Sequence, residues 1–334
     1  MKREEKMLNK TLSGRTKEHM ETNVLLSSII FECVTGSQLY GTASSESDVD
    51  IRGVFIPPQE YYFGFLNNVE QVESKVPDVT CWEIRKFFKL CLDNNPNILE
   101  LLFIPDEFIL KTTKYWDEII ENRNIFISTK ALHTFSGYAV SQLHRIKQHR
   151  EWLLHPIERQ PQRSDFGLPS DRSLVTPDQL NAFTELTLNY SNKIVQDLQI
   201  DVNFLNILQR EKAFLNANIK WNNYEKWKKE RNPARAELEA EFGYDTKHAS
   251  HLARLINEGA ELLTTGMITF PRPDKDELLK IRGGGYSYDE LIKKYGDVDK
   301  IFDSIADKII LPHSPARVEA DKLCQRLIKK YLGV

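Results

Sequence analysis

The chain has 334 residues and a mass of 38.8 kDa, enough to bury a large core, and at about 150 residues per domain its length predicts two domains. Its 45 Lys and Arg residues against 48 Asp and Glu residues give a net charge of −3. This balance excludes a global positive field that would draw the whole chain to nucleic acid or anionic lipid, so any such contact is expected to be local.

The first 22 residues are charged throughout and lack the apolar stretch of a signal peptide, and no later stretch approaches the roughly 18 apolar residues of a membrane span. The four cysteines form no C-x-x-C pair, and three lie in apolar runs, which predicts buried, reduced thiols. We therefore expect a cytoplasmic protein with no membrane contact.

Strand patterns dominate the first third of the chain. The apolar, β-branched run 29–34 ends at a Gly-Ser turn, and the run 49–56 alternates polar and apolar residues until two prolines stop it. Two short runs, 69–73 and 77–81, are separated by a turn-sized gap and predict a hairpin. A helix is expected to begin near Trp82.

Helical patterns dominate the rest of the chain, and the long ones span residues 130–154, 177–200, 202–231 and 245–264. These patterns predict an α/β (α+β) fold in which a small mixed sheet with flanking helices is followed by a mainly helical domain. The expected divisions are a charged tail at 1–22, a sheet-bearing core at 23–125 and a helical domain at 126–334, with the active cleft between the last two.

A D-x-D sequence opens the second strand pattern. Residues two apart in a strand share a face, so Asp48, Asp50 and Arg52 are expected to project to one side. Val49 and Ile51 are then expected to face the core. Two carboxylates held this close repel each other, so a hard divalent cation such as Mg²⁺ is their natural partner.

The turn at Gly36 and Ser37 precedes this D-x-D and leads into a short helix. Backbone N–H groups and a hydroxyl at such a turn can hold phosphate oxygens, although Ser37 is also a natural helix N-cap. Arg52 is expected either to touch a triphosphate or to neutralise the two carboxylates, and the ion-pair interpretation is favoured.

The combined pattern G-S-x-x-Y-G-T followed by S-D-V-D-I-R-G-V-F resembles the DNA polymerase β nucleotidyltransferase superfamily and, more narrowly, the RlaP-like nucleotidyltransferases associated with RNA repair. Further segments similar to that family are residues 83–90, 95–102, 243–255 and 280–283. The resemblance runs from about residue 31 to residue 291. It implies a nucleotidyltransferase-type sheet in the core.

The resemblance implies a third carboxylate and a site for two Mg²⁺ or Mn²⁺ ions. Asp78 matches the third position best, Glu73 is the second candidate and Glu83 the least favoured. Asp48 and Asp50 would then ligate both ions, while Asp78 would ligate the ion that activates the acceptor hydroxyl and serve as a general base.

An NTP is the implied substrate. The residues expected to bind it are Gly36, Ser37, Tyr40, Arg52, Lys247, His251 and Arg254. The last three lie on roughly one face of a helix; without the resemblance, a surface helix with a buried histidine would be the favoured interpretation.

The segment 216–235 interleaves Lys and Arg with Trp221, Tyr224 and Trp227. This pattern fits RNA binding, but an aromatic stripe facing the core is favoured. The expected activity is template-independent transfer of a nucleotide from an NTP to an RNA end, tRNA-like by family association. The alternatives are nucleotidylation of a protein or small molecule, and a non-catalytic module that senses nucleotides.

Overall fold

The computed structural model describes residues 27–45, 47–65, 68–75, 77–189, 201–231 and 233–334. The chain divides into two compact units, one of residues 1–146 and 246–334 and the other of residues 147–245. This division differs from the expected boundary near residue 125, because the chain returns to the sheet-bearing unit after residue 245.

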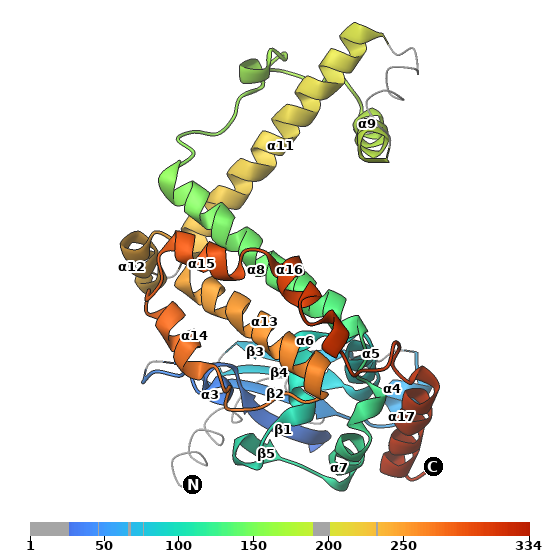
Figure 1. Cartoon of the computed structure of the whole chain (residues 1–334). Coiled ribbons are helices and arrows are strands. Elements are labelled where there is room, and N and C mark those ends of the chain that lie inside the picture. The colour runs from blue at the N-terminus through green and yellow to red at the C-terminus, as the bar shows by residue number, and fades with distance from the viewer. Residues whose placement is uncertain (1–26, 46, 66–67, 76, 190–200, 232) are drawn as a thin grey trace. The chain divides into compact units, whose positions relative to one another are not determined.

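The first unit contains a mixed sheet with the strand order β3-β4-β2-β1-β5 (Figure 1). Its strands are β1 (Ile29–Thr35), β2 (Asp50–Phe55), β3 (Gln71–Lys75), β4 (Asp78–Glu83) and β5 (Ile109–Lys111). β2 and β4 run parallel and the other neighbours run antiparallel. The expected fold class is therefore confirmed, and β3 with β4 forms the expected hairpin.

The strand β2 starts one residue later than its alternating pattern predicts. Its pairing with β1 ends where Thr35 faces Asp50, so Val49 lies outside the strand. The Val49 side chain is 46% exposed, and the expectation that it faces the core is wrong. Alternation alone does not show at which residue a strand loses its neighbour.

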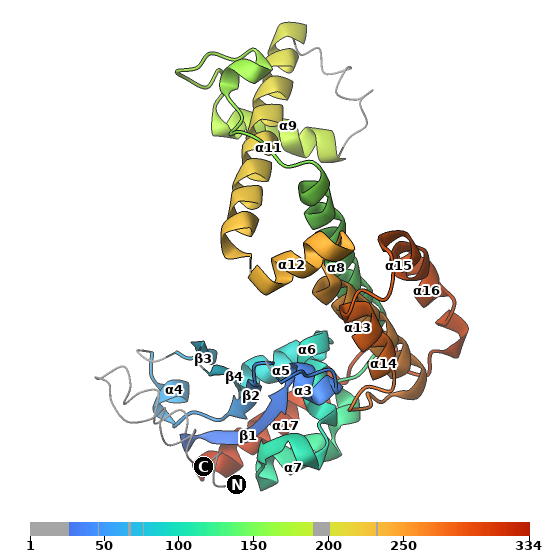
Figure 2. The same cartoon turned by 90° about the vertical axis from the view of Figure 1, so that its left-hand side faces the viewer.

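The first unit also contains helices (Figures 1 and 2). They include α3 (Gly36–Tyr40), α4 (Glu60–Phe63), α5 (Ile84–Leu92), α6 (Pro96–Leu99), α7 (Lys114–Glu121), α13 (Thr246–Thr265), α14 (Lys275–Arg282), α15 (Tyr288–Tyr295), α16 (Val298–Asp303) and α17 (Arg317–Leu332). Short 3₁₀ turns are η1 (Glu100–Phe103), η2 (Asp106–Phe108), η3 (Arg123–Ile125) and η5 (Ala306–Lys308). The helix α5 packs on β2 and β4, α7 packs on β1, and α17 packs on α5 and α7.

The helix α8 (Lys130–Leu154) begins in the first unit, and there it approaches α13 closely. A Cβ atom built on Gly259 of α13 would lie 2.8 Å from the Cβ of Phe135 on α8. Only glycine leaves room for that ring, which is fully buried. This packing explains why the helices after residue 245 belong to the unit that holds the sheet.

The second unit is helical. It holds the end of α8 with η4 (Arg163–Phe166), α9 (Pro177–Asn189), α11 (Val202–Glu230) and α12 (Pro233–Phe242). The long helical patterns of the sequence are confirmed here and in α13, although the predicted helical stretch 190–200 lies outside the described residues, as does the tail 1–22. All four cysteines are free and buried. Among the described residues, no helix combines the length and apolar character that a membrane span requires.

Candidate active site

Two aspartates meet at the start of the only parallel strand pair in the described sheet. Asp50 of β2 lies in direct register with Asp78 of β4. Side chains at paired positions of parallel strands point to the same face, so the two carboxylates are neighbours. Arg52, two residues along β2, forms ion pairs with both, at 3.8 Å to Asp50 Oδ1 and 2.9 Å to Asp78 Oδ1.

The neighbouring charges and partial burial shift the pKa of the Asp50 carboxyl. Burial raises the pKa of its carboxyl above the ordinary value, and a hydrogen bond and the charge of Asp78 raise it further. The positive charges of Arg52 and Lys247 lower it. Burial and the neighbouring carboxylate make ionisation of Asp50 costly, which gives the site an affinity for a cation, and the guanidinium of Arg52 supplies the positive charge here.

Gly36 places the chain against Asp50. Its φ of +66° lies in the left-handed region, and a Cβ atom at this position would lie 2.0 Å from Asp50 Oδ2. The close approach brings the backbone at the start of α3 beside the carboxylate pair. The glycine of the G-S turn is therefore required both for the turn and for the space that Asp50 occupies.

Replacing Gly36 with alanine is expected to lower the free energy of unfolding by more than about 1–2 kcal/mol, because the left-handed conformation alone costs that much and the methyl group also displaces Asp50. Gly137→Ala on α8 is the control, because a Cβ atom at that site meets nothing within 4 Å and alanine there favours a helix by about 1 kcal/mol. Urea unfolding of both variants checks the difference. Equal stabilities would contradict the steric role of Gly36.

Of the other predicted residues, Lys247 has a charge that acts on this pair. Asp48 is exposed and comes two residues before Asp50, Ser37 is partly buried in the first turn of α3, and Lys247 is exposed at the start of α13. Lys247 is close enough for its charge to lower the pKa of Asp50. His251, partly buried, follows Lys247 by one helical turn.

The two other candidates for a third carboxylate lie elsewhere. Glu73 is exposed on β3, where it pairs with Thr80 rather than with the start of β4, and its carboxylate accepts a hydrogen bond from Gln71. Glu83 is buried at the opposite end of β4 from Asp78 and caps α5 by accepting the backbone N–H of Arg85 at 3.1 Å. Asp78 is thus the acid that the strand register brings to Asp50.

Tyr40 and Arg254 take part in a buried network behind α3. The Arg254 side chain is 5% exposed, pairs with Glu100 and at 2.6 Å with Glu258, and lies over the Tyr40 ring at 4.4 Å. Tyr40 donates its hydroxyl to Glu100 at 2.8 Å. The glutamates were not expected from the sequence: Glu258 carries the signal of an i, i+4 pair with Arg254, whereas Glu100 precedes Arg254 by 154 residues.

In the second unit, the aromatic residues of the basic segment 216–235 pack on one another. Tyr224 is buried, and its ring lies 6.1 Å from Trp221 and 5.8 Å from Trp227. His149 of α8 lies 5.6 Å from Trp227. These rings form a packed cluster, as the favoured interpretation of the sequence predicts.

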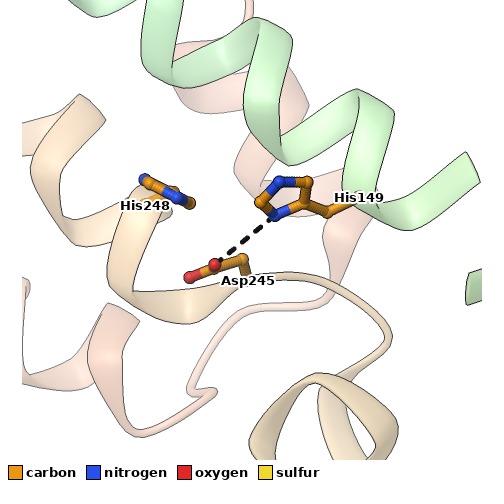
Figure 3. Close-up of side chains that lie close together, drawn as sticks. All are labelled: His149, Asp245 and His248. Atoms are coloured by element: carbon orange, nitrogen blue, oxygen red, sulfur yellow. Dashed lines mark ion pairs between the residues drawn. The ribbon is translucent and has the colours of Figure 1, made fainter. Parts of the chain in front are cut away.

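His149 also pairs with an acid at the end of the second unit. Its Nδ1 lies 3.6 Å from Oδ2 of the fully buried Asp245, and Figure 3 shows the two side chains facing each other. His248, drawn in the same view, belongs to the first unit, where its Nδ1 lies 2.7 Å from Gln142 Oε1. His248 therefore has a polar partner on α8.

Comparison with known proteins gives one family and two relatives. Residues 6–155 match the family model described as RlaP, RNA repair pathway DNA polymerase beta family. An uncharacterized 38.9 kDa protein from the nrdC-mobD intergenic region of Enterobacteria phage T4 is 33% identical over 119 residues, which cover 32% of this chain and 35% of the phage protein. Uncharacterized protein YcgL of Bacillus subtilis (strain 168) is 32% identical over 77 residues, covering 22% of this chain and 30% of YcgL. The chain thus spans 35% or less of the length of these curated relatives. No solved structure matches the chain significantly.

Proposed function

Since residues 6–155 match the model of the RNA repair pathway DNA polymerase beta family, RlaP, we propose that the chain is a nucleotidyltransferase that moves a nucleotide from an NTP to a hydroxyl at an RNA end. The observation that carries the proposal is the in-register pair of Asp50 and Asp78, beside a glycine turn whose shape leaves room for the carboxylates. Transfer is proposed to need no template.

The donor set fits the divalent cations that the family uses. Asp48, Asp50 and Asp78 offer oxygen ligands only, which Mg²⁺ and Mn²⁺ prefer. Burial and the neighbouring Asp78 raise the pKa of Asp50, and a bound cation would offset both effects. These three residues would hold two ions. When bound, the ions supply charge neutralisation at the acceptor hydroxyl and at the leaving pyrophosphate.

The residues of the chain then divide the remaining tasks. Lys247 presents a positive charge beside Asp50 and attracts the triphosphate, while the turn at Gly36 and Ser37 offers backbone N–H groups to its oxygens. His251 lies on the same helix and is proposed to contact the NTP as well. Arg52 is the counter-ion that keeps Asp50 and Asp78 together.

The proposed reaction is one in-line displacement. The acceptor hydroxyl oxygen forms a bond to the α-phosphorus of the NTP, the bond between that phosphorus and the bridging oxygen to the β-phosphate breaks, and pyrophosphate leaves with the electron pair. The hydroxyl proton passes to a carboxylate oxygen of Asp78, which acts as general base.

Transfer of label tests this proposal. Each α-³²P-labelled NTP is incubated with Mg²⁺ or Mn²⁺, with and without small cellular RNA, and RNA and protein products are resolved separately. Label on RNA that disappears in the Asp48→Ala/Asp50→Ala variant is the expected result. Label on protein without RNA would instead indicate nucleotidylation, and NTP binding without any transfer would indicate a sensor.

A further inference from the structure

A basic hollow lies on the C-terminal helix α17 in the first unit. Its volume is about 510 Å³, and its lining residues are Lys322, Gln325, Arg326, Lys329 and Lys330. None of these described lining residues is acidic or apolar. On a chain whose net charge is −3, this is a local concentration of positive charge with room for a polyanion.

Two of the cations are held in place by an acid on the neighbouring helix. Glu118 of α7 accepts hydrogen bonds from Arg326 Nε at 2.7 Å and from Lys330 Nζ at 2.9 Å. Asp321 accepts a bond from Gln325 at 2.6 Å. These two acids leave the hollow with a net positive charge, and they restrict its side chains before a ligand arrives, which lowers the entropic cost of binding.

Aromatic rings lie beside the cations. The rings of Tyr115 on α7 and Tyr331 on α17 lie 5.2 Å apart, and Lys330 and Lys114 lie over the Tyr115 ring at 6.0 and 5.3 Å. Both tyrosines are partly exposed. Cations that track phosphates, combined with rings on which bases stack, are the features by which proteins bind single-stranded nucleic acid without reading its sequence.

We propose that this hollow binds the phosphodiester backbone of single-stranded RNA, holding the body of the acceptor while its end reaches the carboxylate pair. The inference rests on the proposed function, because it takes the acceptor to be RNA. The aromatic neighbours favour RNA over an anionic lipid surface, which has no bases to stack.

The position of α17 sets the geometry of such an acceptor. The helix α17 packs on α5, which begins where β4 ends, and Asp78 lies at the other end of β4 (Figure 1). The hollow and the carboxylates thus belong to the same unit, and an acceptor held in the hollow is proposed to extend from it to Asp50 and Asp78.

Charge reversal tests the surface. Lys322 and Lys329 are exposed, and Glu118 engages neither of them, so Lys322→Glu/Lys329→Glu is expected to fold normally. The control Lys293→Glu/Lys300→Glu changes the net charge equally at exposed positions of α15 and α16. A melting curve of each variant checks the fold.

Binding is measured without NTP, by fluorescence anisotropy of a fluorescein-labelled, unstructured single-stranded RNA at several salt concentrations. For the α17 variant we expect at least about tenfold weaker binding and a salt slope shallower by about 1.4, since each lost phosphate contact on a single strand contributes about 0.7. The control is expected to bind like the unmodified chain.

The proposal is overturned if both double variants bind RNA equally well, or if the α17 variant retains RNA binding but loses binding to anionic phospholipid vesicles. Since binding is read without turnover, its outcome is separate from that of the proposed function. A chain that binds RNA through the hollow and transfers no nucleotide would contradict the proposed activity alone.

Discussion

Replacing Asp78 with asparagine is expected to lower kcat for nucleotide transfer by at least about a hundredfold to a thousandfold, because the substitution removes both a metal ligand and the proposed general base. The fold is expected to persist. The Asp78 side chain is 49% exposed, and its ion pair with Arg52 is of the kind that contributes at most about 1 kcal/mol. Transfer of α-³²P label under saturating NTP, together with a melting curve, measures the two effects separately.

Glu73→Gln is the matched control for this variant. It removes one negative charge from an exposed glutamate on the neighbouring strand β3. Glu73 pairs with Thr80 of β4, which is two residues beyond Asp78. Its kcat is expected to stay within about twofold of that of the unmodified chain, since exposed charges at this distance are screened. If Glu73→Gln abolished transfer and Asp78→Asn did not, the third carboxylate would be Glu73.

The core of this candidate site follows from local rules. The period of two along a strand predicted that Asp50 and Arg52 share a face, and they form an ion pair. The Gly-Ser pair predicted a turn leading into a short helix, and Gly36 begins α3 with a positive φ. The proposal of Asp78 needed the family resemblance, because no local pattern shows that β4 is parallel to β2 and begins level with Asp50.

Long-range packing could not be predicted in the same way. The helical period groups Lys247, His251 and Arg254 on one face, but it does not show which of these side chains are buried and which are exposed. In the structure Lys247 is exposed near Asp50, whereas Arg254 is buried against Glu100. That acid comes from a segment far away in the sequence.

Arg254→Met is expected to lower the free energy of unfolding by about 3–5 kcal/mol, because it leaves Glu100 and Glu258 buried without their shared counter-ion. Arg317→Met is the control, since that guanidinium is 62% exposed and lies 4.0 Å from Asp93, so the expected change is below about 1 kcal/mol. Urea unfolding of both variants at neutral pH measures the difference, and a deficit no larger than that of the control would refute the role of Arg254.

The pH dependence of the free energy of unfolding of Arg254→Met independently tests the effect of Arg254 on the ionisation of Glu258. Burial and the charge of Glu100 already raise the pKa of Glu258 to about 8, and Arg254 lowers it, so removing Arg254 raises the folded-state pKa further. Above the ordinary value of 4.5 the unfolded chain has released a proton that the folded chain still holds. The free energy of unfolding therefore falls as pH rises, and the deficit of Arg254→Met is expected to be larger at about pH 8 than at about pH 5.

Adding Glu258→Gln to Arg254→Met removes the buried acid whose ionisation Arg254 no longer offsets, so it is expected to flatten this pH dependence and to recover part of the lost stability, most of all at about pH 8. The network bears on the site because Arg254 lies over the ring of Tyr40, the last residue of α3, and Gly36 is the first. A stability deficit that Glu258→Gln fails to reduce would mean that Arg254 contributes packing against Tyr40 rather than charge neutralisation.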